Sequence, residues 1–249
     1  DRTIAVVGTR RMSSYGKEVT ERFVTELVSQ RFTIVSGMAY GIDAAAHWAA
    51  INAGGGTIAV LGCGIDIIAP PGNAKLYRTI IGGGGAVVSE MPLGHRPLKG
   101  LFPARNRIIS GLSLATLVIE GADDSGALIT ARNAAEQGRD VFAVPGPITS
   151  ALSRAPLRLI KDGATLVESV DDILETLRVK KMTSGALKKS LTGSTKEEQM
   201  ILDSVSQSRQ HIDDLVRLTG LTAQNVAAIL TILEIKGLVK DYGEKTYGI

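Results

Sequence analysis

The chain of 249 residues contains one cysteine, Cys63, so it cannot form an internal disulfide. Its 3 histidines are widely scattered in the sequence, which argues against a zinc or iron–sulfur site. The apolar runs are far shorter than the roughly 20 residues that a membrane helix needs, and no signal-peptide pattern is present. We therefore expect a cytoplasmic protein with no membrane partner, no metal and no cofactor.

Aromatic residues make up only 4% of the chain, which disfavours a large platform for stacking bases. No charge sign dominates: the net charge is +3, and residues 1–177 carry 17 basic and 17 acidic side chains. Residues 178–195 carry 5 basic and 0 acidic side chains, and residues 196–249 carry 6 and 8. Within the first 177 residues, the stretch 67–119 is locally basic, with 6 Lys or Arg against Glu90 alone. Glycine, by contrast, is abundant at 28 residues, which suits backbone that approaches a ligand closely.

Short β-branched runs alternate with helical stretches through the first two-thirds of the chain. Strict alternation predicts an α/β fold with a mostly parallel sheet and helices on both faces. The expected strands are Thr3–Gly8, Thr33–Ser36, Thr57–Leu61, Ala86–Glu90, Ala115–Glu120 and Asp140–Val144. The expected helices are Tyr15–Arg31, Asp43–Ala53, Asn73–Ile81, Ala104–Leu112 and Ser125–Gln137, with helix-ending glycines at Gly54, Gly82 and Gly138.

A change of composition divides the chain after this region. Residues 178–195 are rich in Lys, Ser, Thr and Gly and lack apolar periodicity, which is typical of a flexible linker. We expect a first domain over residues 1–177 and a small winged-helix domain over residues 196–249. Its expected elements are helices Glu197–Ser206, His211–Leu218 and Ala223–Lys236, the last ended by Gly237, and a hairpin that pairs Leu238–Val239 with Thr246–Ile249.

The loops that follow the predicted strands carry residues suited to anions. Arg10 follows the first strand and precedes a helix, whose free backbone N–H groups favour an anion; an ordinary turn with Arg10 in solvent is an equal alternative. We expect Arg10 to lie beside the N-terminus of that first helix, and Arg11 to serve as its control. Neither GxGxxG nor GxxxxGK[ST] is present, which disfavours a nicotinamide or ATP enzyme.

The starts of two further predicted helices also favour binding of an anion. Arg105 and Arg107 are expected to open a helix, where the positive end of the dipole opposes them unless an anion is bound. Ser125 is expected to cap the helix after the fifth strand or to contact phosphate. Several such helix starts at one sheet edge predict an extended chain of phosphates as the ligand. Two nearby residues favour structural roles: Asp43 as a helix N-cap, and His47 as a packed histidine.

Seven segments between Ile4 and Asp172 together resemble the DNA processing protein A family, also called DprA or Smf. They are GTRRMSSYG, SGMAYGIDAAAH, GCGID, SEMPLG, FPARNRIISGLS, VIEGADDSGALITARNAAEQGRDVFAVPG and LIKDGA. The resemblance implies a Rossmann-like domain that binds single-stranded DNA and loads a RecA-type recombinase during natural transformation. It also implies a homodimer, formed through the later part of that domain, without catalysis. The C-terminal unit resembles the winged-helix domain that many members carry.

Residue types and resemblance together give the predicted DNA-binding residues. They are Arg10, Ser36, Gly37, Gly41, Asn73, Lys75, Arg105, Asn106, Arg107 and Ser125. The sequence departs from the family pattern at Tyr40, where many relatives carry a basic residue, at Ala69, where a tyrosine is common, and at Leu157, where an asparagine is usual. The resemblance therefore carries no DNA contact to these three positions.

Two other functions remain open. One is an enzyme that resembles the nucleoside-monophosphate phosphoribohydrolases, although Glu120–Gly126 stands where those enzymes have PGGxGT and no nucleophile–base set is evident. The other makes the winged-helix domain the main DNA reader. Its expected recognition helix, Thr222–Lys236, has no Arg and a single Lys at its end, which favours a packing, protein-contact or regulatory role.

Overall fold

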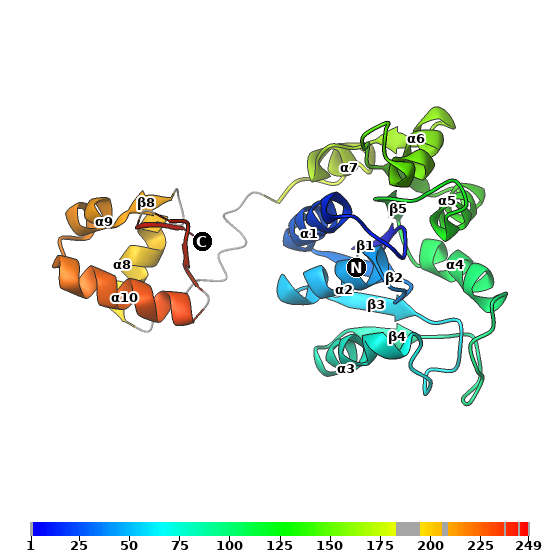
Figure 1. The fold of residues 1–249 in the computed structure, drawn as a ribbon, viewed down its shortest axis with the longest axis horizontal. Helices are drawn as coiled ribbons and strands as arrows, with labels where there is room; N and C mark the ends of the chain where they lie inside the picture. Colours follow the sequence, from blue (N-terminus) through cyan, green and yellow to red (C-terminus); the bar gives the residue numbers. More distant parts are fainter. Residues whose placement is uncertain (1, 183–194, 206–208, 237, 244, 249) are drawn as a thin grey trace. The chain divides into compact units, whose positions relative to one another are not determined.

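A seven-stranded, all-parallel sheet forms the centre of the first unit (Figure 1). The computed structural model describes residues 2–182, 195–205, 209–236, 238–243 and 245–248, and the chain divides into units Asp1–Lys181 and Met182–Ile249. The strands are β1 (Arg2–Val7), β2 (Phe32–Ser36), β3 (Thr57–Val60), β4 (Ala86–Val88), β5 (Ala115–Val118), β6 (Asp140–Ala143) and β7 (Thr165–Leu166). Their order is β4-β3-β2-β1-β5-β6-β7, so the direction of winding reverses between β1 and β5.

Helices cover both faces of this sheet (Figure 1). One face carries α1 (Ser14–Ser29), α2 (Ile42–Asn52), α3 (Ala74–Gly82) and α7 (Val170–Thr176). The other carries α4 (Leu101–Gly111), α5 (Gly126–Glu136) and α6 (Arg154–Lys161). Side chains of β1 point alternately to the two faces of the sheet: Ile4 and Val6 pack against α1 and α2, whereas Ala5 and Val7 pack against α4 and α5.

The expected α/β fold is confirmed, and all six expected strands and five expected helices occur. The prediction missed β7, α6 and α7, which are short: β7 has 2 residues, α6 has 8 and α7 has 7. Helix α4 begins at Leu101, earlier than expected, because Pro103 fits the first turn of a helix rather than preceding it. The glycine with positive φ after α3 is Gly84 (φ +81°), not Gly82.

The second unit is a helical bundle closed by a three-stranded antiparallel sheet, as a winged helix requires. Its elements are α8 (Lys196–Val205), β8 (Gln210–His211), α9 (Ile212–Thr219), α10 (Ala223–Ile235), β9 (Lys240–Asp241) and β10 (Thr246–Gly248). The prediction missed β8, and the hairpin pairs β10 with β9 rather than with Leu238–Val239, because Val239 enters the core. The expected stop at Gly237 and residues 183–194 of the expected linker lie outside the described residues.

In the part of the chain that the structure describes, no single helix has the length and apolar character to cross a membrane, and the pair α9–α10 qualifies only across a bend of 112°. Within the same part of the chain, no group of three or more His, Cys, Asp or Glu side chains is arranged to hold a metal ion.

Candidate nucleic-acid interface

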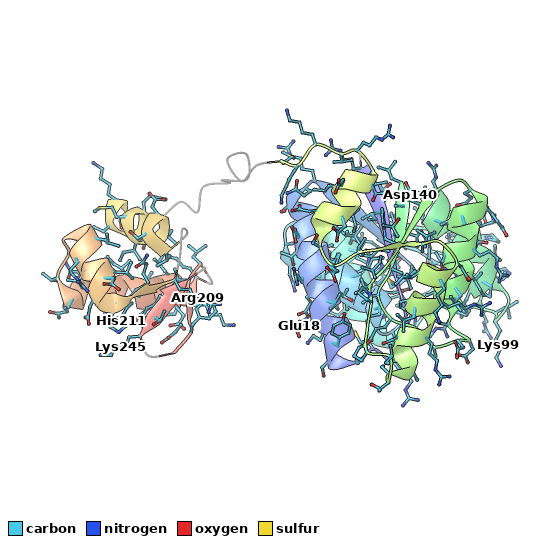
Figure 2. The ribbon with its side chains drawn as sticks, turned by 90° about the horizontal axis from the view of Figure 1, so that it is seen from above. Glu18, Lys99, Asp140, Arg209, His211 and Lys245 are labelled. Carbon is cyan, nitrogen blue, oxygen red and sulfur yellow. The ribbon has the colours of Figure 1, made fainter. Side chains whose placement is uncertain are left out.

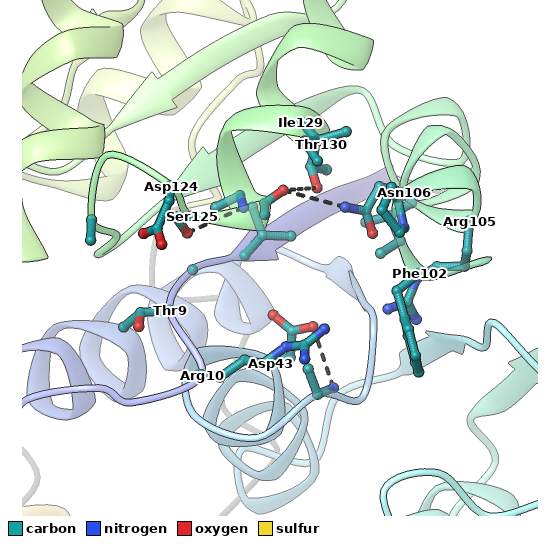
Figure 3. A pocket seen from close by; sticks show the side chains of 18 of the residues that line it. Thr9, Arg10, Asp43, Phe102, Arg105, Asn106, Asp124, Ser125, Ile129 and Thr130 are labelled. Atoms are coloured by element: carbon teal, nitrogen blue, oxygen red, sulfur yellow. Dashed lines mark hydrogen bonds between the residues drawn. The ribbon is translucent and has the colours of Figure 1, made fainter. Parts of the chain in front are cut away.

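A cavity of about 590 Å³ opens at the carboxyl ends of β1 and β5, where the strand order reverses (Figure 3). Its walls are the loop after β1, the first turns of α4, and the start of α5. Loops diverge at such a reversal and leave a crevice, which is the usual ligand site of an open α/β sheet. The volume lies in the range of about 300–1,000 Å³ common for ligand pockets.

Exposed cations line the cavity. Arg10 is exposed, and its guanidinium carbon lies 5.5 Å from the centre of the Phe102 ring. Arg11 and Lys99 are also exposed and also line the cavity, opposite the single exposed carboxylate of Asp124. Within the described part of the chain, no ion pair joins any of the three cations to a carboxylate. The lining is therefore electropositive.

The start of α5 forms the opposite wall. Ser125 is the N-cap, and its Oγ accepts a hydrogen bond from the Ala127 N–H at 3.3 Å. Asn106 Nδ2 donates to the Gly126 carbonyl at 3.3 Å, which ties α4 to this turn. A side chain at Gly126 would meet no atom within 4 Å, so the turn faces open space. The Leu128 N–H donates to the Ser125 carbonyl at 3.0 Å, so among the described hydrogen bonds the Gly126 N–H is the donor at this helix start that has no partner, and Gly126 lines the cavity.

The start of α1 is already occupied. The Ser13 N–H and Ser13 hydroxyl both donate to the Glu120 carboxylate, at 3.0 and 2.5 Å. Gly16 makes room for this contact, since a Cβ there would lie 2.1 Å from Glu120 Oε2. The expectation of an anionic ligand at the N-terminus of α1 is therefore wrong, because a carboxylate of the chain itself fills that position. Glu120 is only 4% exposed, so it is no free carboxylate for an enzyme either.

Arg105 belongs to the layer beneath the cavity. Its side chain is buried, and Nη1 donates to the Gly37 carbonyl at 2.7 Å and to the Val60 carbonyl. Burial lowers the pKa of Arg105, the Asp43 carboxylate opposes this shift, and the nearby Arg10 charge lowers the pKa further. The dipole argument for Arg105 and Arg107 is wrong, because α4 begins at Leu101 and neither residue lies at its start.

Asp43 also has a different role from the one expected. The N-cap of α2 is Gly41, with φ +77°, and the Asp43 carboxylate accepts from the Gly37 and Ala39 N–H groups at 3.2 and 3.4 Å. Burial raises the pKa of Asp43, and Arg105 counteracts that effect. The His47 ring is buried and bonds Thr57 through Nδ1 at 2.6 Å, in agreement with a packed histidine. Its burial, and then Arg105, lower its pKa to about 3.

The structure separates the ten predicted DNA-binding residues. Four line the cavity: Arg10, Arg105, Asn106 and Ser125. Ser36 and Asn73 are buried and donate to backbone carbonyls of Val6 and Met38. Gly37 and Gly41 allow close packing against Arg105 and Thr9. Lys75 and Arg107 are absent from the lining of the cavity: Lys75 lies 6.0 Å from the Trp48 ring, and Arg107 pairs with Glu90 at 2.5 Å.

Sequence reasoning missed the aromatic wall of the cavity. Phe102 lies within 6.0 Å of both Arg10 and Arg105, measured from the ring centre to each guanidinium carbon. Its signal was present in the FPARNR segment, but a helix expected to begin at Ala104 left Phe102 in a loop with no assigned direction. Starting α4 at Leu101 places Phe102 in its first turn, facing Arg10 (Figure 3).

Known proteins match both units. The profile of the family described as "DNA recombination-mediator protein A" matches residues 1–178, and that of the "DprA winged helix domain" matches residues 186–243. Protein Smf of Escherichia coli is 51% identical over 175 residues, which cover 70% of this chain and 47% of that protein.

Two solved structures are similar to the first unit. The X-ray structure of DNA processing protein A from Streptococcus pneumoniae has a TM-score of 0.66 and 46% identity, over 70% of this chain and 61% of that one. A structure of DNA processing protein A from Helicobacter pylori, titled for its single-stranded DNA binding mode, has a TM-score of 0.64 and 30% identity, over 71% and 80%. This chain thus spans only about half of the E. coli relative and under two-thirds of the pneumococcal chain.

Proposed function

This chain belongs to the DNA recombination-mediator protein A family, and we propose from that premise that it binds single-stranded DNA as a recombination mediator in natural transformation. One observation carries the proposal. An exposed arginine, Arg10, faces the open start of α5 across a cavity with an aromatic wall, at the edge where sheets of this kind bind ligands.

The cavity suits a phosphodiester chain. A phosphate between Arg10 and the α5 start would meet a bidentate guanidinium and the positive end of a helix dipole. Phe102 offers a ring on which an unstacked base of a single strand can lie, an arrangement that a duplex cannot supply without opening. Arginine and backbone N–H groups contact phosphate rather than base edges, so we expect binding that is indifferent to sequence.

Binding without catalysis is the reading that the cavity favours. Glu120 is committed to Ser13, and Asp43 to the Gly37 and Ala39 N–H groups, so neither acts as a free base. From family membership we further propose a RecA-type recombinase as partner, action in the cytoplasm, and a homodimer formed through the later part of the first unit. Light scattering at micromolar concentration tests the dimer, and a species of only 26.2 kDa would contradict it.

Replacement of Arg10 tests the DNA site. We expect Arg10→Ala to weaken binding of labelled oligothymidylate by about tenfold, as the loss of one charge-assisted phosphate contact does. The slope of log K against log salt should fall by about 0.7, the contribution of one contact to single strands. Arg10→Lys should recover part of the loss, because an ammonium carries the charge without the bidentate geometry.

Arg11 is not a clean control, because it lines the same cavity. Arg22, exposed on α1 and absent from the cavity lining, removes the same charge elsewhere. Arg22→Ala should bind as the parent does. Equal affinities of the Arg10→Ala and Arg22→Ala proteins, with unchanged melting temperatures, would refute the cavity as the DNA site.

A further inference from the structure

The sheet of the second unit has one face toward its core and one toward solvent. In its register, Tyr247 lies opposite Gln210 on one side and Asp241 on the other, and Gly248 lies opposite Lys240. Tyr247 packs against the hydrophobic core of the unit. Since side chains alternate along a strand, Gly248 and its neighbours across the sheet lie on the outer face. Arg209, which precedes Gln210, falls in the same row as Gly248 and Lys240.

A cluster of cations around one aromatic ring occupies this outer face. The Arg209 guanidinium carbon lies 3.8 Å from the centre of the Tyr242 ring, and the Lys240 ammonium lies 5.6 Å from it. All three side chains are exposed. Gly248 makes the arrangement possible, because a Cβ there would lie 3.0 Å from Arg209 Cγ and 3.2 Å from Tyr242 Cε2. We call Arg209, Lys240 and Tyr242 the outer-face cluster.

Carboxylates are few around the cluster. Among the described residues of this sheet the single carboxylate is Asp241, which lies on the other face by register and accepts from the Gly243 N–H at 2.7 Å. Glu244, in the turn, lies outside the described residues. Lys245, before β10, is a further exposed cation of this region (Figure 2), whereas the His211 ring caps α9 by accepting from the Asp213 N–H at 3.2 Å.

The helices of the same unit offer no comparable surface. Helix α10, which occupies the place of a recognition helix, has neither Lys nor Arg between Ala223 and Ile235. Arg217 on α9 is paired with Asp214 at 2.6 Å, and Glu197 and Asp203 of α8 are exposed carboxylates. An anionic polymer approaching this unit is therefore attracted to the sheet and not to the helices.

We propose that the outer-face cluster is a second nucleic-acid contact, which binds the phosphate backbone through Arg209 and Lys240. Stacking on Tyr242 fixes the plane of the Arg209 guanidinium and leaves its N–H edge for a phosphate, so little side-chain freedom is lost on binding. The proposal goes beyond the function assigned to the first unit, because it requires neither Arg10 nor the cavity. Two contacts on one chain raise the avidity for a strand that reaches both.

The test compares two double variants of the full chain. Arg209→Gln with Lys240→Gln removes two charges from the outer face, and Lys196→Gln with Arg217→Gln removes two from α8 and α9 of the same unit. For a long labelled oligothymidylate at about 0.1 M salt, we expect the outer-face variant to bind about 25-fold more weakly and to lower the salt slope by about 1.4, two contacts at 0.7 each. The helix variant should keep the parent slope. A matching duplex probe shows whether the contact distinguishes one strand from two.

Three results separate the possible outcomes. Equal slopes for both double variants would overturn the proposal, as would equal losses, which would mark a general charge effect. If an unfolding transition shows the outer-face variant to be misfolded, the single change Lys240→Gln, at 5.6 Å from the ring, takes its place. Repeating the comparison with Arg10→Ala keeps the two sites distinct: failure of the cavity leaves the outer-face effect intact, and failure of the outer face leaves the Arg10 effect intact.

Discussion

The rim of the cavity and the layer beneath it both contain an arginine, but in different environments. Arg10 at the rim is exposed and has no ion-pair partner among the described residues, whereas Arg105 beneath, like Glu120, is buried and bonded to the chain itself. Both arginines lie near one ring, that of Phe102, at 5.5 and 6.0 Å. Residue type therefore does not identify a ligand-binding group: what matters is whether the fold has already supplied its partner.

The two helix starts at this edge make the same point. Helices α1 and α5 begin after the neighbouring strands β1 and β5, and each has a serine N-cap. At α1 the Glu120 carboxylate bonds Ser13, whereas the α5 start opens onto the cavity. An anion is favoured at both, but only α5 has room for one that comes from outside.

Removal of Arg105 should have the largest effect on the fold. Arg105→Ala leaves the buried Asp43 charge without its compensating cation and two carbonyls without a donor. We expect the free energy of unfolding to fall by about 3–5 kcal/mol, as when one member of a buried pair is lost, and chemical denaturation measures this. Arg10→Ala, at the rim, should leave that free energy nearly unchanged. If the Arg105→Ala protein is as stable as the parent and has lost only DNA binding, the claim that Arg105 stabilises the fold while Arg10 binds DNA is wrong.

Acid should lower the free energy of unfolding through the buried His47. The pKa of His47 is lowered to about 3, so between about pH 6.5 and pH 3 the unfolded chain binds a proton that the folded chain does not. The stabilisation is complete above about pH 6.5 and is lost as the pH falls, by about 2 kcal/mol between pH 7 and pH 5. Denaturation at several pH values measures it, and His47→Asn should flatten the profile. An identical slope in that variant would show that other groups are responsible.

A smaller effect on stability than at Arg105 or His47, together with a clear effect on binding, is expected at the start of α5. Ser125→Ala removes the hydrogen bond to the Ala127 N–H and should cost about 1 kcal/mol of stability. Because this turn also faces the cavity, oligothymidylate affinity should fall by a few fold. Ser13→Ala is the matched control at α1, and it should lower stability without a direct loss of affinity. Comparable losses of affinity at both caps would mean that the two helix starts are equivalent.

The architecture followed from the sequence because it depends on local pattern. Alternating apolar strands and glycine-ended helices predicted every strand from β1 to β6 and the helices between them. The site was only partly predictable. Residues far apart in the sequence meet only after the sheet forms: Ser13 and Glu120 are separated by 107 positions, and Gly37 and Arg105 by 68. No local pattern shows which helix start or arginine will bind a group of the chain itself instead of a ligand. In addition, placing the start of α4 three residues too late led to the wrong role for Arg105 and left Phe102 unnoticed.

A structure of the chain with a short oligothymidylate tests the central claim most directly. The account predicts a phosphate within hydrogen-bond distance of the Arg10 guanidinium and of the Gly126 N–H at the start of α5, with Glu120 still bonded to Ser13. A phosphate at the start of α1 in place of Glu120, or a strand bound away from this cavity, would contradict it.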